Sequence, residues 1–379
     1  MSLANKLIAE LRGDKAIWMI VILLSLFSLL IIYSSTGRIA YLEHEGNNSF
    51  YLFRQMMVIA GGWFIMYLCY KMHYSRFSQI APFLLAIAIP LLAFTLVFGV
   101  NINDAKRWIR IAGVSFQTSD FAKIALVLFV ARAIASKQDR IKEFSGAFVP
   151  IILPIVIVCG LIAPADLSTA IILFATCFAM MFVGRIEIKY LGALVLSGLA
   201  AFAMIFFIGI QTSLIPRVHT WVKRVSDFVG DSDGGYQIMQ AKIAIARGGW
   251  FGVGPGNSLQ RNYLPSPYSD YIYSIICEEY GLFGAFFILG LYVMLFFRVT
   301  GLVTKTAKTF GAMLAMGLCL LIVIQGVTNM CVSVHLIPVA GLTLPMVSMG
   351  GTSFWFMSIA MGMILSVSKQ VEREQFEAE

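Results

Sequence analysis

Ten apolar segments, each long enough to cross a membrane as a helix, constrain the fold of this chain more than any other feature. A helix needs about twenty apolar residues to span a hydrocarbon core of about 30 Å. Hydrophobic residues make up 59% of the 379 residues and charged residues only 13%, which argues against a set of soluble domains. We therefore predict an all-α integral membrane protein in which residues 1–379 form a single polytopic membrane domain. The ten predicted transmembrane helices are residues 16–35, 53–70, 81–99, 119–136, 147–163, 167–184, 189–210, 271–297, 309–331 and 347–368.

The distribution of basic residues predicts how these spans are oriented. Lys6, Arg12 and Lys15 precede the first span, and no small-residue cleavage site follows it, so we expect a retained span with a cytoplasmic N-terminus. Ten spans bring both termini to the cytoplasmic side and leave a large extracytoplasmic loop, residues 211–270, between helices 7 and 8. Aromatic and apolar residues in this loop predict short interfacial helices. The net charge of +8 is explained by this topology, which makes nucleic-acid binding the poorer interpretation.

The segment from Gly248 to Gly281 is the most polar and glycine-rich interruption between the apolar runs. Its glycines, among them Gly254 and Gly256 before Ser258, predict a sharp turn or a close approach of the backbone to another group. No Gly-Lys-Ser/Thr sequence follows, so a phosphate-binding Walker loop is excluded. Two interpretations stay open at this stage: close packing of the loop on the helices, and a binding loop.

Asp270 stands at the entrance of the eighth predicted span. Its position fits an N-cap of that helix, and it equally fits a general base whose pKa is raised by its surroundings toward the working pH. Helix geometry places Glu278 about 80° around the axis from Asp270 and Glu279 on the opposite side, both roughly 12 Å deeper. The three acids therefore cannot share one helix face.

A basic and aromatic cluster lies at the outer end of the third span. Lys106, Arg107, Trp108 and Arg110 run against the general concentration of cations on the cytoplasmic side. They fit an interfacial anchor with snorkelling cations. They also fit a site for the phosphates of a lipid headgroup.

Three further charged residues lie at the starts of predicted spans. Asp120 and Lys123 are three residues apart and can pair on one face of the fourth span, for which Thr118 or Ser119 would be the N-cap. The pair would either lock two helices together or meet a pyrophosphate group through its lysine. Asp166 is expected to cap the sixth span, with direct contact to a substrate as the alternative.

The sequence lacks the motifs of a zinc site, of a disulfide framework and of a nucleophilic serine. The four histidines are scattered without a zinc-binding spacing, and the six cysteines lie singly in apolar runs. Ser348 occurs in SMGGTS, which is not the setting of a nucleophilic serine. No cofactor is identified from these patterns, and the identity of any metal is left unknown.

Several motifs occur together and in order. They are RWI at 107–109, FQTSDFAK at 116–123, ADLS at 165–168, GGWFGVGPGNS at 248–258, YLPSPYSDYIYSIICEEYG at 263–281 and IPVAGLTLPMVSMGGTS at 337–353. Together they resemble the SEDS family (shape, elongation, division and sporulation), and the start of the chain is more like the division branch. Asp120 stands where the family has Glu, and Ser168 stands where it has Gly.

The resemblance implies a ten-span, inverting glycosyltransferase that polymerises lipid II into peptidoglycan on the outer face of the bacterial cytoplasmic membrane, for septal wall synthesis. It implies that Asp270 is the catalytic residue and deprotonates the acceptor hydroxyl. A lipid pyrophosphate then leaves and meets cations, either Lys123 and Arg107 or a divalent cation held by carboxylates. The expected substrate-binding residues are Arg107, Trp108, Lys123, Asp120, Asp166, Glu278, Glu279, Gly254, Gly256, Ser258 and Ser348.

The resemblance also implies partners. These are a single-span class B penicillin-binding protein, other membrane proteins of the division machinery and the lipid bilayer. Two other functions stay open: a lipid II flippase, in which spans five and six would line a path, and a non-catalytic division scaffold.

Overall fold

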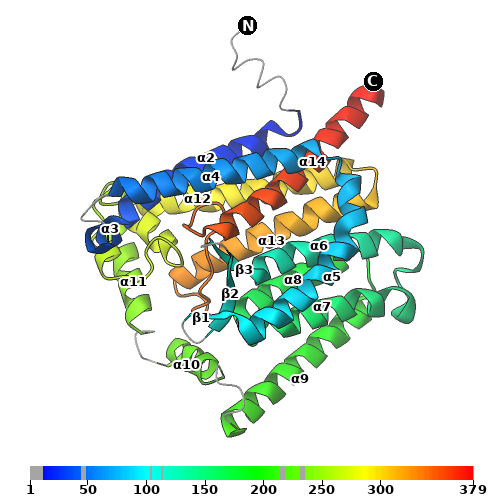
Figure 1. Cartoon of the computed structure of the whole chain (residues 1–379), viewed down its shortest axis with the longest axis horizontal. Coiled ribbons are helices and arrows are strands. Elements are labelled where there is room, and N and C mark those ends of the chain that lie inside the picture. The colour runs from blue at the N-terminus through cyan, green and yellow to red at the C-terminus, as the bar shows by residue number, and fades with distance from the viewer. Residues whose placement is uncertain are drawn as a thin grey trace.

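The computed structural model describes residues 12–43, 48–102, 105–111, 114–212, 218–230 and 235–378. It is a bundle of long helices with one small sheet at its centre (Figure 1). The helices are α2 Lys15–Ser35, α3 Gly37–Glu43, α4 Asn48–Lys71, α5 Tyr74–Phe98, α6 Thr118–Ser136, α7 Val149–Ile162, α8 Leu167–Val183, α9 Ile188–Thr212, α10 Val218–Val229, α11 Tyr236–Gly248, α12 Ile272–Lys305, α13 Thr309–Ser333 and α14 Thr352–Ala378. The strands are β1 Val100–Ile102, β2 Ala105–Ile111 and β3 Val114–Gln117, and the short turns of helix are η1 Gln138–Arg140, η2 Phe144–Phe148 and η3 Gln260–Asn262.

Each of the ten predicted spans corresponds to a helix. In the described part of the chain, seven helices are long and apolar enough to cross a membrane, and two further apolar helices, α8 and the first part of α9, are shorter. The tenth is α6, which carries Asp120, Lys123 and Arg132 within its length. Fourteen of its 19 residues are buried, among them Asp120 and Lys123, so this charged pair lies inside the bundle and not against lipid. Arg132 is partly exposed and donates a 2.5 Å hydrogen bond to the Ser78 carbonyl.

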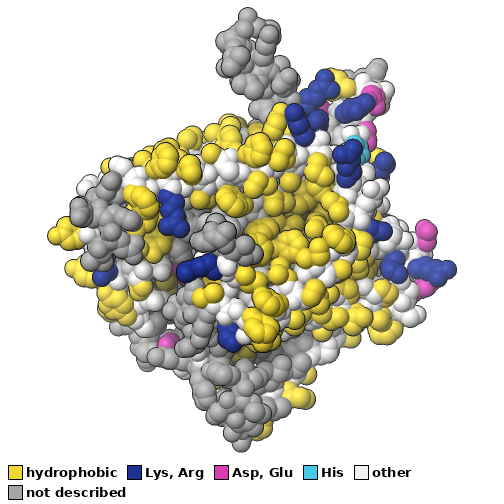
Figure 2. Space-filling view, in the orientation of Figure 1, with side chains coloured by type: hydrophobic (Ala, Val, Ile, Leu, Met, Phe, Trp, Pro, Cys, Tyr) yellow, Lys and Arg dark blue, Asp and Glu magenta, His cyan; other side chains and the backbone are white. Residues whose placement is uncertain are grey.

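The exterior of the bundle is that of a membrane protein. Figure 2 shows a broad hydrophobic surface across the middle of the molecule, with Lys and Arg side chains gathered at the end where α14 finishes. The start of α2 lies at that same end, since the Asp14 amide donates a 2.7 Å hydrogen bond to Ser368 Oγ of α14. A chain that crosses a membrane an even number of times has its first and last spans ending on the same side. The chain is a multi-pass membrane protein.

The predicted loop of residues 211–270 contains the two short helices α10 and α11 and the turn η3. Tyr271 packs with Ala241 of α11 and Leu264 in a small buried cluster, which holds this segment on the start of α12. The segment is thus an ordered layer over one end of the bundle in its described parts.

The three-stranded sheet was not part of the sequence prediction. Its strands are antiparallel in the order β1-β2-β3, and Trp108 pairs with Gln117. The basic cluster lies on β2, the central strand, so its side chains are held by a ladder on both sides. The sheet joins α5 to α6 and carries Arg107 and Trp108 toward the bundle.

Helix α12 is broken at Gly281, where φ is 64° and ψ is −161°. This backbone conformation is essentially restricted to glycine. The segment of residues 249–254 binds the backbone groups that the break sets free: the Val253 and Gly254 amides donate to the carbonyls of Glu278 and Glu279 at 2.9 and 3.0 Å. On the other side of the break, the Leu282 amide donates to the Gly249 carbonyl at 3.0 Å. The glycine-rich segment therefore packs closely on a helix, which was one of its two predicted roles.

Candidate active site

A cavity of about 1230 Å³ opens between α4, the β2–β3 ladder, α6, α10 and the loops that flank α12 and α13; we call it the central cavity. Six predicted site residues line it together: Arg107, Trp108, Asp120, Lys123, Asp166 and Asp270. They come from four separate parts of the sequence, so the fold brings them together. Other residues that line it include Gln55, Arg54, Arg224, Gln237, Gln325 and Gly341.

Asp270 lies at the end of the loop that precedes α12. It does not cap this helix, whose N-cap residue is Tyr271. The Ser269 hydroxyl donates a 2.6 Å hydrogen bond to Asp270 Oδ1, and Gly341 lies against the other carboxylate oxygen. A Cβ atom at Gly341 would be 3.7 Å from Asp270 Oδ2. The capping role that was left open for Asp270 is thus not the one observed.

The backbone of Asp270 is held from two sides. Asn329 Nδ2 on α13 donates hydrogen bonds to the Asp270 carbonyl at 2.9 Å and to the Leu342 carbonyl at 2.6 Å. The Ser348 hydroxyl donates to the Ser269 carbonyl at 2.7 Å. These bonds fix the carboxylate relative to α13 and to the turn that precedes α14.

The surroundings of Asp270 change its acidity. Burial raises the pKa of its carboxyl above the ordinary value of 3.8, and the negative charge of Asp166 acts in the same direction. The hydrogen bond from Ser269 and the positive charges of Arg107 and Arg224 oppose this effect. A carboxylate with a raised pKa is a better proton acceptor than an ordinary one.

Arg107 and Asp166 form an ion pair at the cavity wall. Arg107 Nη1 lies 2.8 Å from Asp166 Oδ2, and the Arg107 side chain keeps 23% of its surface exposed. Asp166 Oδ1 accepts a 3.2 Å hydrogen bond from the Thr169 amide, which confirms the predicted N-cap of α8. The guanidinium is therefore oriented by the start of α8 while part of it stays open to the cavity.

Asp120 and Lys123 form the predicted pair within α6. Lys123 Nζ lies 2.7 Å from Asp120 Oδ1, so the shorter acid at position 120 still reaches the lysine. Both side chains are almost fully buried. The predicted N-cap of this helix was wrong by one or two residues, because the helix begins at Thr118 and its N-cap is Gln117.

Two amides on α13 connect these groups, and the sequence prediction missed both. Lys123 Nζ donates to Gln325 Oε1 at 3.2 Å, and Gln325 Nε2 donates to the Thr343 carbonyl at 3.0 Å. One turn further along, Asn329 holds the Asp270 carbonyl. The available signal was a pair of carboxamides at positions i and i+4 inside an otherwise apolar span, where polar side chains are unfavourable unless paired.

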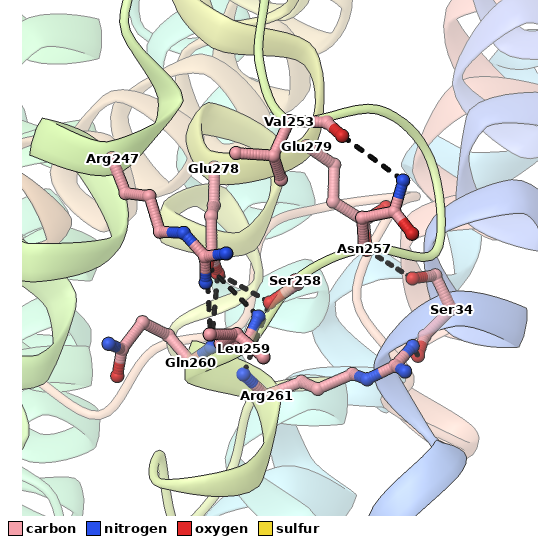
Figure 3. Close-up of polar contacts among 10 residues, drawn as sticks. All are labelled: Ser34, Arg247, Val253, Asn257, Ser258, Leu259, Gln260, Arg261, Glu278 and Glu279. Atoms are coloured by element: carbon pink, nitrogen blue, oxygen red, sulfur yellow. Dashed lines mark hydrogen bonds and ion pairs between the residues drawn. The ribbon is translucent and has the colours of Figure 1, made fainter.

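Glu278 lies outside the central cavity and organises the loop before Asp270 (Figure 3). Its buried carboxylate accepts hydrogen bonds from the Ser258 hydroxyl at 2.5 Å and from the Leu259 amide at 3.0 Å. Arg247 Nη1 of α11 pairs with it at 3.2 Å. Glu278 therefore ties together α11, α12 and the start of the loop.

Glu279 points away from Glu278, toward α2 (Figure 3). The angles predicted relative to Asp270 do not apply, because Asp270 precedes α12. The Ser34 hydroxyl donates to its carboxylate, and Arg261 Nη1 donates to the Ser34 carbonyl at 2.9 Å. Gly254 and Gly256 lie in the neighbouring loop with positive φ values of 92° and 82°.

Six of the twelve predicted site residues are thus not brought to the central cavity. They are Glu278, Glu279, Gly254, Gly256, Ser258 and Ser348. Their contacts hold loops that lead to the cavity, and direct contact of these residues with a substrate stays a prediction. Among the described residues, no group of three or more His, Cys, Asp or Glu side chains is arranged to hold a metal ion.

Fold and cavity together define a class: a multi-pass helical membrane protein with an internal site that combines one carboxylate of raised pKa with several cations. Comparison with known proteins identifies the family. The family model for FtsW, RodA and SpoVE, described as a cell cycle protein, matches residues 14–373, and the chain belongs to this family.

Relatives cover nearly the whole chain. The probable peptidoglycan glycosyltransferase FtsW of Trichlorobacter lovleyi is 31% identical over 361 residues, 94% of this chain and 93% of the relative. The stage V sporulation protein E of Bacillus subtilis is 33% identical over 365 residues, with 94% and 97% covered.

Solved structures share the fold. A chain from a structure described as "Structural coordination of polymerization and crosslinking by a peptidoglycan synthase complex" matches with a TM-score of 0.76 at 25% identity, covering 95% of this chain and 98% of that one. The rod shape determining protein RodA of Thermus thermophilus matches with a TM-score of 0.69 at 22% identity, covering 97% and 99%.

Proposed function

We propose that this protein is a peptidoglycan glycosyltransferase that polymerises lipid II at the outer face of the cytoplasmic membrane, in the division branch of its family. The single observation that carries the proposal is Asp270, a carboxylate of raised pKa that shares the central cavity with Arg107, Lys123 and Arg224. A base and several cations are what glycosyl transfer from a pyrophosphate donor requires. The relatives named peptidoglycan glycosyltransferase support the same reaction.

The reaction is a single inverting displacement. The 4-hydroxyl of the acceptor sugar loses its proton to Asp270 as its oxygen forms a bond to the anomeric carbon of the donor sugar. The bond between that carbon and the pyrophosphate oxygen breaks, and the electron pair leaves with the polyprenyl pyrophosphate. Arg107, held by Asp166, and Lys123, held by Asp120, stabilise the charge that develops on the leaving group. The described residues do not fit the other prediction, a divalent cation held by carboxylates, because Asp120 and Asp166 pair with Lys123 and Arg107 and no cluster of three acids is formed.

The charge distribution supports the orientation that we propose for the chain in the membrane. Lys and Arg gather at the end where α14 finishes (Figure 2), which fits the cytoplasmic side. Helices α3 and α11, near the cavity, lie at the other end (Figure 1). Both termini are then cytoplasmic, the segment of residues 211–270 is extracytoplasmic, and the whole chain forms one membrane domain. A class B penicillin-binding protein is the expected partner, in line with the synthase complex that contains a similar chain.

Purified protein with its partner transpeptidase, supplied with lipid II, tests this function. We expect polymer from the wild type and at least a hundredfold loss in Asp270→Asn, on the order of the contribution of a general base. Asp139→Asn is the matched control, because Asp139 is exposed on η1 and does not line the cavity. Normal polymerisation by Asp270→Asn would show that the base is assigned wrongly. Transfer of labelled lipid II across liposomes without polymer would favour a flippase instead, and activity of neither kind would favour a scaffold.

A further inference from the structure

Gln55 is a buried residue of α4 to which the sequence assigned no role. The residue is only 1% exposed, and it lines the central cavity next to Arg54 on the same helix. A polar side chain that is buried within a membrane span needs partners for both ends of its amide.

The hydrogen bonds around Gln55 identify the positions of its amide nitrogen, Nε2, and its amide oxygen, Oε1. Gln55 Nε2 donates to Ser28 Oγ of α2 at 3.0 Å, and the Ser28 hydroxyl donates to the Val347 carbonyl at 2.8 Å. A carbonyl only accepts, so the single proton of Ser28 is committed to Val347. Ser28 can then only accept from Gln55, which requires the amide nitrogen to face α2. The carbonyl end of Gln55 is left for another partner.

That carbonyl oxygen, Oε1, has no hydrogen-bond partner in the described part of the chain. Asp120 Oδ2, on another residue that lines the central cavity, is also buried without a hydrogen-bond partner among the described residues. Unpaired buried acceptors are unfavourable in a folded protein. Two of them at one cavity indicate a ligand that brings its own donors.

The chemistry of these two oxygens indicates which part of a ligand can bind to them. An acceptor repels a phosphate, whose oxygens are acceptors as well, and it binds a hydroxyl or an amide N–H. The cations of the cavity supply the complementary site for the pyrophosphate. We propose that Gln55 accepts a hydrogen bond from an uncharged O–H or N–H donor of the headgroup beyond the pyrophosphate of a glycosylated polyprenyl lipid; this inference rests on the proposed function.

The same turn of the chain supports Gln55 and Asp270. Val347 accepts the hydrogen bond from Ser28, and its neighbour Ser348 donates to the Ser269 carbonyl at 2.7 Å. These hydrogen bonds connect Gln55, through Ser28 and the turn at residues 347–348, to the loop that carries Asp270. A ligand held by Gln55 is positioned relative to the carboxylate and not only retained in the cavity.

The test compares two ligands on one variant. Gln55→Met keeps the size of the side chain and removes the acceptor Oε1 together with the donor Nε2, and any effect of losing the Ser28 bond should be equal for both ligands. In nanodiscs with the partner transpeptidase, we expect the KM for lipid II to rise on the order of tenfold, which corresponds to about 1.4 kcal/mol. The inhibition constant of polyprenyl pyrophosphate, which has the same anchor and pyrophosphate but no headgroup beyond them, should not change.

Ser25→Ala is the matched control, because Ser25 accepts a 3.1 Å hydrogen bond from Trp63 Nε1 between the same two helices but does not line the cavity. It should leave both constants unchanged. An unchanged KM in Gln55→Met, or an equal change for both ligands, would overturn the inference. Asp270→Asn in the same assay tests the proposed function separately, and direct binding of fluorescent lipid II gives the Gln55 comparison even if no polymer forms.

Discussion

The break in α12 makes the sharpest prediction for stability. Replacement of Gly281 by alanine would place a Cβ atom 2.4 Å from the Trp250 carbonyl oxygen and 2.5 Å from the Gly252 nitrogen. Both are backbone atoms, so no side-chain rotation relieves the contact. The φ of 64° and ψ of −161° are also unfavourable for alanine.

The magnitude follows from these two effects. Strained backbone at such a position costs about 2 kcal/mol. Movement of the 249–254 segment away from the new Cβ would weaken about two backbone hydrogen bonds across the break, each contributing about 1 kcal/mol. We therefore expect Gly281→Ala to lower the free energy of unfolding by about 4 kcal/mol. Polymerisation should fall with it, because Glu278 and the loop before Asp270 depend on the same break.

The measurement is denaturant unfolding in mixed micelles, followed by tryptophan fluorescence. Gly290→Ala is the control, because Gly290 lies in the same helix and a Cβ there would meet nothing within 4 Å. Alanine is the better helix former, so this variant should be as stable as the wild type or slightly more stable. Equal unfolding midpoints for the two variants would refute our account of the break.

Two further predictions concern the site. A base must be ionised, so the rate of polymerisation should decline as pH falls through the raised pKa of Asp270. In the pH–rate profile, Asp166→Asn, which removes a negative charge, should move this decline to lower pH, and Arg107→Ala should move it to higher pH. A decline at the same pH in both variants would count against Asp270 as the titrating group. Asn329→Leu removes the hydrogen bonds to the Asp270 and Leu342 carbonyls and should lower kcat by roughly tenfold to a hundredfold with little change in KM. Ser333→Ala removes only a hydrogen bond to the Asn329 carbonyl and should leave kcat unchanged. Equal kcat values for the two variants would exclude the positioning role of Asn329.

Much of the fold could be predicted because hydrocarbon is a demanding solvent. Every backbone group in a span must be paired within its own helix, so an apolar run of sufficient length specifies a helix before any tertiary contact is considered. Local spacing was equally informative for the Asp120 and Lys123 pair and for the Asp166 cap, since each depends on residues within one or two turns.

The sheet and the break in α12 could not be predicted from local sequence patterns. The strands around Arg107 are short and polar, and their pairing depends on the way α5 and α6 approach each other. The break depends on a partner thirty residues away, because the backbone groups freed at Gly281 are satisfied only by the segment of residues 249–254. Long-range hydrogen bonding of this kind leaves no periodicity in the local sequence.

The sequence by itself determined the membrane class, the ten helices and, through ordered motifs, the identity of Asp270 as the residue of greatest interest. Only the tertiary structure decided which of the motif residues share the cavity with it. Arg107 and Lys123 do, whereas Glu278 turns toward α11 and holds a loop. The reason is physical: Asp270 lies in the loop before α12 whereas Glu278 lies within that helix, so their directions are set by different contacts. Charged groups from distant segments meet only where the packed bundle leaves a polar space for them.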